Sequence, residues 1–328
     1  MNVLVVIPCL NEEAHIDALL RQLLEDPVVG LIVVADGGST DGTLGILDSY
    51  TDKTDRIRIL HNPAKIQSAG INQAVAEFGN GYDVLLRVDA HCLYPDNYAA
   101  KVLEALKENK ADCVVVPMLT IGRTGFQYAV ATAQNSVLGT GGSAHRHLGD
   151  GCFVEHGHHA LMKLSLFRQV GGYCEAMPCN EDAELDFRLV SQGAKIWLEP
   201  KAAIEYFPRS TPKALWRQYF RYGVGRACNI RRNRMRPRLR QVLPLAVPLA
   251  VIVLPLTYFH WIFALPSVAW FVLCLGLGAV IGLKSGHKWG VLAGVAAAIM
   301  HLAWGLGFFW EFISRPSRVK PKYGLLET

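Results

Sequence analysis

Three polar clusters near the start of the chain each follow a short apolar run. They are Pro8-Cys9-Leu10-Asn11-Glu12, residues 36–43, and Arg87-Val88-Asp89-Ala90-His91. A carboxylate in such a place can accept a hydrogen bond from a base N–H or a ribose hydroxyl. Two metal-ligating side chains two residues apart, such as Asp89 and His91, can hold a cation against a diphosphate. Three such clusters indicate a nucleotide site more strongly than a single glycine-rich turn would.

The elements that must position these clusters alternate between strand and helix. Short apolar or β-branched runs predict strands at residues 3–7, 31–34, 57–60, 84–88 and 113–117. Helical periodicity predicts a helix that opens at residues 11–13 and stops near Pro27, and helices at 64–78 and 96–109. This alternation predicts an α/β domain with a mostly parallel, Rossmann-like sheet, whose ligands bind at the carboxyl ends of the strands. We place this domain at residues 1–212; beyond residue 120 the rhythm breaks, and helices are expected near 164–170 and 181–192.

Charge divides the chain into three parts. Of its 328 residues, 51% are hydrophobic and 19% are charged, against about 25% charged in an ordinary soluble domain. Residues 1–212 carry a net charge of −9, residues 213–240 carry +10 with no acidic residue, and residues 241–328 carry +4. Such an apolar composition excludes intrinsic disorder and a collagen-like structure. We therefore expect an acidic body, a basic amphipathic interfacial collar over 213–240 and an apolar tail.

The apolar tail is long enough to enter a membrane. Residues 241–283 include no Lys, Arg, Asp or Glu, and these 43 residues are about twice the ~20 that span a bilayer once. Pro255 and Pro266 around His260 suggest a hairpin of two spans, and the charge-free run 289–310 is long enough for a third. We place membrane-associated helices at 241–313 and a basic tail at 314–328. Three full spans cannot put every basic cluster on one side, so the last segment is re-entrant or interfacial, or one cluster breaks the positive-inside rule. A buried core helix is the competing interpretation.

The basic collar and the cysteines indicate where the chain works. Seven arginines between residues 226 and 240 directly precede the apolar run, which predicts that they lie on the cytoplasmic side and bind anionic lipid headgroups. An Arg-rich run can also bind nucleic acid, but the neighbouring apolar tail argues against that partner. The eight cysteines are irregularly spaced without Cys-x-x-Cys, and the N-terminus lacks the features of a signal peptide. We expect reduced thiols and a cytoplasmic catalytic domain.

The order of the polar clusters resembles that of the inverting glycosyltransferases of family 2, which have the GT-A fold. Those enzymes typically carry Pro-x-x-Asn-Glu, Asp-Asp-Gly-Ser-x-Asp-Gly-Thr, Asp-x-Asp, Glu-Asp and Gln-x-x-Arg-Trp. The further counterparts here, after the first two clusters, are Asp89-Ala90-His91, Glu181-Asp182 and Gln218-Tyr219-Phe220-Arg221-Tyr222. The resemblance covers about residues 2–222. The whole layout, including the apolar tail, is most similar to bacterial exopolysaccharide glucosyltransferases of the succinoglycan-assembly kind.

The resemblance implies a role for each matching residue. Asp182 would be the general base, and Asp89 with His91 would bind Mn²⁺ or Mg²⁺. The nucleotide-sugar, a UDP-sugar, would be bound by Pro8, Asn11, Glu12, Asp36 and Asp89. The departing phosphates or the acceptor would be bound by Gln218, Arg221 and Glu181. Because His91 stands where the family carries Asp, and imidazole suits Mn²⁺ better than Mg²⁺, a manganese preference is expected.

Structural roles are alternatives for several of these side chains. Asp36 and Asp41 could serve turn and cap hydrogen bonds, His91 could be a loop histidine, and Asp182 could be a helix N-terminal charge favoured by the dipole. Lys65 and Arg87 could contact phosphates or be structural. A set of three histidines has either a structural or acceptor-pocket role, which we favour, or a metal-binding one: His156, His158 and His159.

These expectations combine into one function. We expect an inverting, metal-dependent transfer of a hexose, glucose with a β-linkage, from a UDP-sugar to a lipid-linked oligosaccharide in bacterial exopolysaccharide biosynthesis. The site would lie on the cytoplasmic face of the bacterial inner membrane. Two other functions are open: a polyprenyl-phosphate glycosyltransferase, whose acceptor is the lipid phosphate, and a membrane-tethered nucleotide-sugar sensor without turnover.

Overall fold

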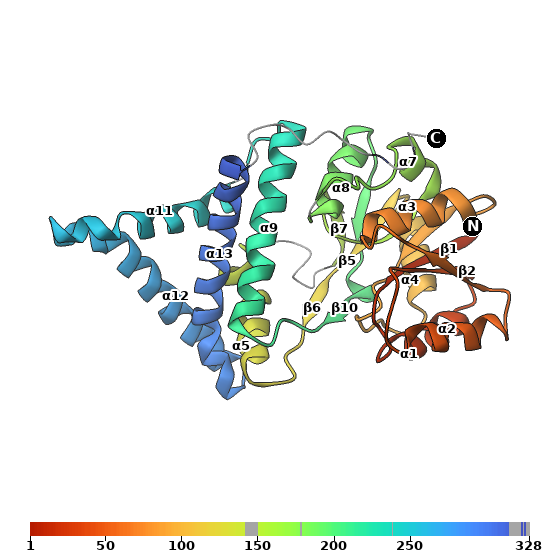
Figure 1. Ribbon diagram of the computed structural model, residues 1–328, viewed down its shortest axis with the longest axis horizontal. Coiled ribbons are helices and arrows are strands. Elements are labelled where there is room, and N and C mark those ends of the chain that lie inside the picture. Colours follow the sequence, from red (N-terminus) through yellow and green to blue (C-terminus); the bar gives the residue numbers. More distant parts are fainter. Residues whose placement is uncertain (142–149, 178, 238, 315–322, 324, 326–328) are drawn as a thin grey trace.

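The computed structural model describes residues 1–141, 150–177, 179–237, 239–314, 323 and 325. An α/β body holds the chain up to β10 (Ile204–Tyr206), except for α5 (Gly125–Gln134) and α6 (Val137–Thr140), and a group of long helices stands against one side of it (Figure 1). The predicted basic tail at 314–328 lies almost wholly outside the described residues.

The body is built on a mixed sheet. In the described part of the chain it has eight strands in the order β3-β2-β1-β4-β8-β5-β9-β7. Neighbouring strands β3, β2, β1 and β4 are parallel, whereas β8 runs antiparallel to both β4 and β5. A separate parallel pair joins β6 (Met118–Thr120) to β10 (Ile204–Tyr206). The strands of the large sheet are β1 (Val3–Cys9), β2 (Val29–Asp36), β3 (Ile57–His61), β4 (Val84–Arg87), β5 (Cys113–Val116), β7 (Cys152–Val154), β8 (His158–Lys163) and β9 (Ile196–Leu198).

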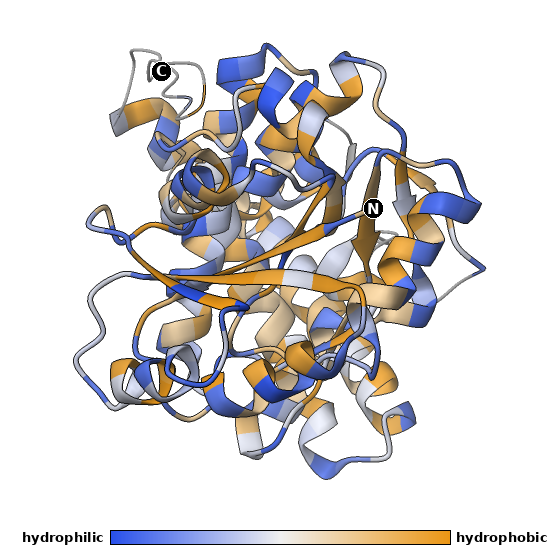
Figure 2. Ribbon diagram, turned by 90° about the vertical axis from the view of Figure 1, so that its right-hand side faces the viewer, coloured by the Kyte–Doolittle hydropathy of each residue, from blue (hydrophilic) through white to orange (hydrophobic). Residues whose placement is uncertain are grey.

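Alternating side chains of β1 fill two cores, one on each face of the sheet. Val3, Val5 and Ile7 face one core, and Leu4 and Val6 face the other, because successive side chains in a strand point to opposite faces. The first core is covered by α1 (Ile16–Glu25), α2 (Thr43–Thr51) and α4 (Tyr98–Glu108). The second is covered by α3 (Gln67–Phe78), α7 (Leu164–Gln169) and α8 (Glu181–Ser191). Figure 2 shows the apolar strands lying between helices whose outer sides are hydrophilic.

The α/β class, the mostly parallel sheet and its first strands are confirmed, with two differences. The first helix begins at Ile16, since residues 11–15 form turns. No strand was predicted for the segment around His158 and His159, which forms β8 in the middle of the sheet; the helix expected after it is present as α7. This strand opens with two histidines and lacks the apolar alternation by which strands are recognised.

The helices beside the body begin with α9 (Pro212–Asn233), which packs along α13 (Ala293–Ser314). A small core joins this pair to α5 (Gly125–Gln134) through Ala129, Leu215 and Met300. The remaining short helices are α6 (Val137–Thr140), α10 (Leu239–Val242) and α11 (Ala246–Ile252). The last long helix, α12 (Leu265–Lys284), leans away from the body together with α11 (Figure 1). Thus α13 is shared between the apolar tail and the body.

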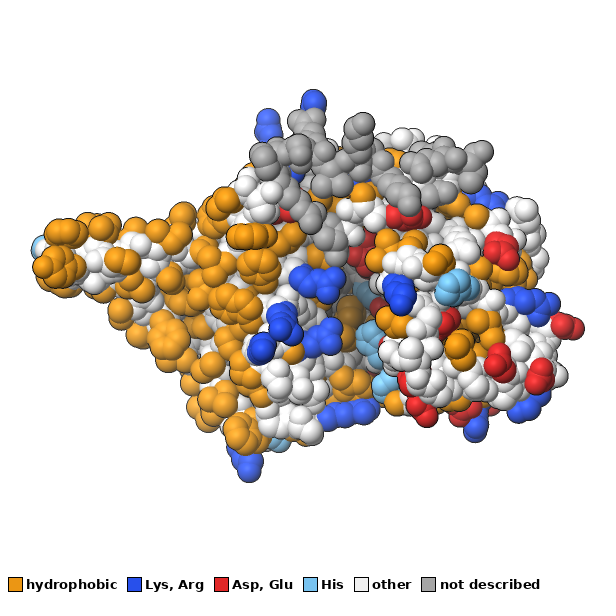
Figure 3. Space-filling view, viewed as in Figure 1, with side chains coloured by type: hydrophobic (Ala, Val, Ile, Leu, Met, Phe, Trp, Pro, Cys, Tyr) orange, Lys and Arg blue, Asp and Glu red, His pale blue; other side chains and the backbone are white. Residues whose placement is uncertain are grey.

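Two helical stretches of the described chain are long and apolar enough to cross a membrane, Trp261–Lys284 and Lys288–Ser314. The expected hairpin of two spans within 241–283 is therefore wrong. Prolines such as Pro244, Pro248 and Pro255 divide its first half into α11 and short 3₁₀ turns, because proline lacks a backbone donor and clashes with the preceding turn. Hydrophobic side chains cover the α11–α12 arm, and Lys and Arg side chains gather where the arm meets the body (Figure 3).

The basic collar is partly internal. Arg231 donates to the backbone oxygen of Glu311 at 3.1 Å, and its guanidinium lies 3.6 Å from the buried Glu311 carboxylate. Arg232 lies 3.6 Å from Glu184, which is also buried. Only part of the collar therefore faces outward, including the exposed Arg234 and Arg236. The side chains of two further collar arginines, 238 and 240, lie outside the described residues.

Candidate active site

The three predicted polar clusters meet at the carboxyl ends of β1, β2 and β4. Asn11 N–H donates to Ser39 Oγ at 2.8 Å, and Glu12 N–H donates to Thr43 Oγ1 at 2.9 Å. The third cluster joins them through His91, whose Nδ1 lies 3.1 Å from Glu12 Oε1. A cavity of about 1630 Å³ opens beside them. The neighbourhood expected from parallel topology is present.

Asp36 supports the loop rather than facing the cavity. Its carboxylate is 3% exposed and accepts hydrogen bonds from Gly38 N–H at 2.8 Å and from Ser39 N–H at 3.0 Å. The Ser39 hydroxyl donates to the same carboxylate at 2.5 Å. Gly38 has a φ of +86°, a conformation that favours glycine. Asn11 accepts from Thr40 N–H at 2.8 Å, and neither Asn11 nor Asp36 lines the cavity, whereas Pro8 and Glu12 do.

A buried guanidinium joins the two carboxylates of greatest interest, Asp89 and Asp182. Arg87, at the end of β4, is 4% exposed; its Nε donates to Asp89 Oδ1 at 3.3 Å, and its Nη1 donates to Asp182 Oδ1. The Tyr173 hydroxyl donates to the same Asp182 oxygen at 3.0 Å, and Gln67 donates to Asp89 at 2.7 Å. Sequence reasoning left Arg87 open between a phosphate contact and a structural role; its partner Asp182 is 95 positions away.

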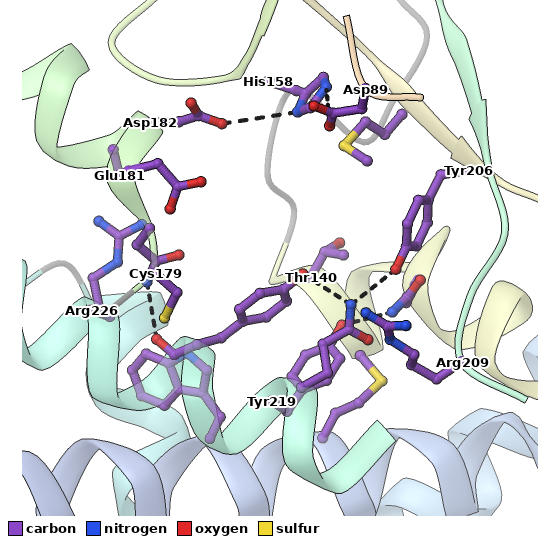
Figure 4. Close-up of a pocket in the computed structure, with 18 of the residues that line it drawn as sticks. Asp89, Thr140, His158, Cys179, Glu181, Asp182, Tyr206, Arg209, Tyr219 and Arg226 are labelled. Atoms are coloured by element: carbon purple, nitrogen blue, oxygen red, sulfur yellow. Dashed lines mark hydrogen bonds and ion pairs between the residues drawn. The ribbon is translucent and has the colours of Figure 1, made fainter. Parts of the chain in front are cut away.

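His158 stands between the same two carboxylates, as Figure 4 shows. Its Nε2 lies 3.6 Å from Asp89 Oδ2, and its Nδ1 lies 4.0 Å from Asp182 Oδ2. Burial lowers the pKa of His158, so its imidazole is neutral near pH 7. The second oxygen of Asp182 thus faces His158 and the cavity, while its first oxygen is held by Arg87 and Tyr173.

Electrostatics separates the acidic groups into two kinds. Burial alone would raise the pKa of Asp89, but Arg87, His158 and His91 outweigh it and hold this pKa at about 2. Glu181 behaves oppositely, because burial and the neighbouring carboxylate of Asp182 raise its pKa. Asp89 is therefore a permanent anion, as a nucleotide or metal ligand must be.

The other two histidines of the predicted set belong to a neighbouring ion-pair cluster. Asp186 on α8 is 1% exposed; its Oδ2 lies 2.6 Å from His156 Nδ1, and its Oδ1 lies 2.5 Å from His159 Nε2. His159 is fully buried, whereas His156 also lines the cavity. This arrangement agrees with the structural and pocket roles favoured over metal binding.

The donor atoms at Asp89 and His91 fit a divalent cation shared with a diphosphate. Glu12 accepting from His91 Nδ1 would leave Nε2 as the ligand atom, the arrangement in which a carboxylate orients a metal-binding imidazole. The hydrogen bond with Glu12 raises the pKa of His91. No group of three or more His, Cys, Asp or Glu side chains suited to a metal occurs among the described residues. Two protein ligands would leave the other positions to phosphate oxygens and water.

The far wall of the cavity is formed by α9 and the segment before it. Gln218 Nε2 donates to the hydroxyls of Tyr206 and Tyr222 at 2.9 and 3.0 Å, so Gln218 and Tyr222 of the partial motif do lie at the site. Arg221 is exposed and turned away from this cavity. On this wall the cavity is lined instead by Arg209 and Arg226, which Figure 4 shows on opposite sides, and elsewhere it is lined by Lys65 and Arg87. Sequence analysis did not single out Arg209, and it assigned Arg226 to the lipid-binding collar rather than to this cavity.

The same cavity continues to the apolar helices. Its lining includes Asp89, Glu181 and Asp182 at one end. At the other end it includes hydrophobic side chains of the tail: Leu243, Val247, Trp270, Leu277, Ile281 and Trp304. The space-filling view shows the hollow between body and helices (Figure 3). A single ligand could therefore touch both the acidic site and the apolar arm.

Comparisons with known proteins agree with this geometry. The model of the family described as Glycosyl transferase family 2 matches residues 4–171. The succinoglycan biosynthesis protein ExoA of Rhizobium meliloti (strain 1021) is 48% identical over 319 residues, 96% of each chain.

Solved structures show the same fold at low identity. A mannosyltransferase from Pyrobaculum calidifontis in complex with GDP-Man and Mn²⁺ has a TM-score of 0.58 at 14% identity, over 96% of this chain and 88% of the other. GalNAc-T7 with UDP, GalNAc and Mn²⁺ has a TM-score of 0.50 at 14% identity, over 70% and 50%. These similarities confirm the predicted GT-A-type fold.

Proposed function

Because this chain belongs to glycosyl transferase family 2, we propose that it is an inverting enzyme that moves a hexose from a UDP-sugar to a lipid-linked saccharide. The hexose is glucose, the new linkage is β, and the product is an intermediate of a bacterial exopolysaccharide. The 48% identity to a succinoglycan biosynthesis protein supports the role in exopolysaccharide assembly. The catalytic body works on the cytoplasmic face of the inner membrane.

The observation that carries the proposal is the continuity of the cavity. Asp89 and Asp182 line one end, and Trp270, Leu277 and Ile281 of α12 line the other. Trp261–Lys284 is only 17% buried over its most apolar window, so this helix has no protein partner over most of its surface. A saccharide on a lipid carrier fits such a cavity, because its sugar is polar while the chain that carries it is apolar.

The chemistry assigned to the site is a single displacement. Asp182 takes the proton from the acceptor hydroxyl through Oδ2, the new C–O bond forms at the anomeric carbon, and the bond from that carbon to the UDP oxygen breaks. Attack from the opposite face turns an α-linked donor into a β-linked product. Arg209 and Arg226, which line the cavity, attract the phosphates of the donor or of the lipid. Asp89 and His91 would hold Mn²⁺ or Mg²⁺, which when bound offsets the charge of the diphosphate.

The proposed location of the catalytic body on the cytoplasmic face rests on cationic side chains next to an apolar surface. Exposed Arg234 and Arg236 precede the apolar arm, and cations in this place favour the cytoplasmic side and anionic lipids. The eight cysteines are all free, as expected in a reducing compartment.

The test offers UDP-glucose, UDP-galactose and UDP-GlcNAc to the purified protein with extracted lipid-linked intermediates, and identifies products by mass spectrometry. The proposal predicts UDP release and one added hexose on a lipid-linked saccharide with UDP-glucose. A sugar attached directly to polyprenyl phosphate would instead establish the polyprenyl-phosphate transferase. If the protein bound a UDP-sugar but released UDP from none of the three donors, the nucleotide-sugar sensor would be established instead.

A further inference from the structure

Arg87 is a cation enclosed between two anions that have different tasks in the proposed reaction. Its side chain is 4% exposed, against 14% for Asp89 and 17% for Asp182. Taking a guanidinium out of water is costly unless its charge is paired and its N–H groups are bonded. Here the charge is paired with two carboxylates through Nε and Nη1. Burial alone would lower the pKa of Arg87, but Asp182 and Asp89 outweigh it and raise this pKa well above its usual value.

The fork of the guanidinium gives each anion its own edge. Nε donates to Asp89 Oδ1 at 3.3 Å, while Nη1 donates to Asp182 Oδ1 and also to the Tyr173 hydroxyl at 3.2 Å. A planar group with fixed donor directions sets the separation and orientation of both carboxylates, which a lysine ammonium cannot do. The result is that Asp182 Oδ2 is the oxygen left to face the cavity.

We propose that Arg87 is a positioning residue that holds the acceptor-activating Asp182 in register with the donor-binding Asp89. The inference rests on the proposed function, since it takes Asp182 as the base and Asp89 as a donor ligand. Tyr173 assists, because its hydroxyl donates to Asp182 at 3.0 Å. Arg87 itself acts through these groups and forms no bond to the reacting atoms.

A second arginine, largely enclosed, provides a control. Arg188 on α8 forms an ion pair with Glu184 at 2.7 Å and donates to the Gly172 oxygen at 2.8 Å. It is 13% exposed and does not line the cavity. Arg188→Lys removes the planar guanidinium and disturbs the helix that carries Asp182, but it removes no contact to the Asp182 carboxylate. Its effect on turnover therefore measures what the loss of a structural arginine on α8 costs.

The experiment is a double-mutant cycle on the full chain in detergent. Arg87→Gln and Tyr173→Phe are each made in the wild-type background and in Asp182→Asn, and Arg188→Lys is made in both as the control. Turnover, KM for the lipid acceptor, UDP affinity and melting temperature are measured for every protein. Tyr173→Phe keeps the buried ring and so covers the case in which Arg87→Gln fails to fold.

If Arg87 positions Asp182, its replacement lowers turnover by about 100-fold, the cost of a misplaced catalytic group, and Tyr173→Phe lowers it by roughly 10-fold. Both factors fall to about threefold or less in the Asp182→Asn background, where no base remains to be positioned. Arg188→Lys changes turnover by the same factor in both backgrounds.

Equal factors for Arg87→Gln or Tyr173→Phe in the two backgrounds would overturn the inference and leave the proposed function standing. Arg87→Lys is made in addition, and its full turnover would overturn the inference too, because a single ammonium cannot hold both carboxylates. A wild-type protein that transfers no sugar would overturn the proposed function itself, and the inference with it.

Discussion

The close contact between α9 and α13 makes the effect of a glycine-to-alanine substitution on stability depend on its place. Alanine should destabilise the protein at Gly307, inside the contact, and stabilise it at Gly276, outside the contact. A Cβ added to Gly307 of α13 would overlap the backbone oxygen of Phe220 on α9, and one added to Gly223 of α9 would overlap the backbone oxygen of Trp304. A Cβ added to Gly276 on α12 would meet no atom within 4 Å. Backbone oxygens cannot rotate away, so the two helices must separate to accept alanine at Gly307.

The magnitudes follow from two opposing effects. Replacing glycine by alanine within a helix is worth about 0.5–1 kcal/mol in favour of the folded state. Overpacking costs about 1–3 kcal/mol. Gly307→Ala should therefore lower the free energy of unfolding by about 1–2 kcal/mol, whereas Gly276→Ala should raise it by about 0.5–1 kcal/mol. For a chain of 328 residues unfolding as one unit, 1 kcal/mol corresponds to roughly 1.5 °C in melting temperature.

The assay is thermal unfolding of both variants in the same detergent, with transfer to the lipid acceptor measured alongside. Gly307→Ala should melt below the wild type and Gly276→Ala at or above it. UDP affinity should stay unchanged in both, because neither glycine lines the cavity. Melting shifts of the same sign and size at the two sites would refute the close α9–α13 contact.

Three further predictions concern an ion pair, the collar and the metal. Burial alone would raise the pKa of Asp186, but His159 and His156 lower it to about 2. The ionised carboxylate therefore contributes stability that is present above its unfolded pKa of about 3.9. This stability is lost as the pH falls through the folded pKa. Asp186→Asn should accordingly flatten the loss of stability between about pH 4 and pH 2 in acid-unfolding curves, and an unaltered slope would contradict the ion pair. Replacing the exposed Arg234 and Arg236 together by Gln should weaken binding to anionic vesicles by roughly 30-fold at low salt, since each cation contributes on the order of 1 kcal/mol. Arg231→Gln should instead lower the melting temperature through its bonds to Glu311; a vesicle-binding loss as large as that of the double variant would show that Arg231 faces lipid. EDTA should abolish transfer, Mn²⁺ should restore it better than Mg²⁺, and His91→Asp should shift the preference toward Mg²⁺; equal rescue by both ions in both proteins would remove His91 from the metal ligands.

The parts of the fold that were predictable depend on local patterns. The strand before Asp89 is a short apolar run, and a parallel sheet brings its end beside Pro8 and Glu12, so their meeting at the cavity was foreseeable. For Asp36 the sequence left two roles open, a contact to the nucleotide and hydrogen bonds within the turn. Whether its carboxylate faces a ligand or the Ser39 hydroxyl depends on side-chain orientation, which residue types do not specify.

The parts that were not predictable depend on distant partners. Arg87 is buried because Asp182 and Tyr173 reach it from segments 86 to 95 positions away. His158 and His159 sit in a central strand because Asp89, Asp182 and Asp186 compensate their polarity. On α9, which carries Arg221 and Arg226, helical rotation decides which arginine reaches the cavity, and the packing against α13 sets that rotation.

The central claim, that Asp182 accepts the proton of a lipid-linked acceptor at one end of a cavity shared with the donor, is tested most directly by the Asp182→Asn variant. Radiolabelled UDP-glucose is incubated with lipid extract, label entering the organic phase is counted, and UDP–Mn²⁺ affinity is measured by calorimetry, with Asp89→Asn as the comparison. We predict that Asp182→Asn loses about 10²–10⁴-fold in turnover while its UDP affinity is nearly unchanged, and that Asp89→Asn loses affinity as well. Retention of more than about a tenth of wild-type turnover by Asp182→Asn, well short of that expected loss, would contradict the claim and make Glu181 the candidate base.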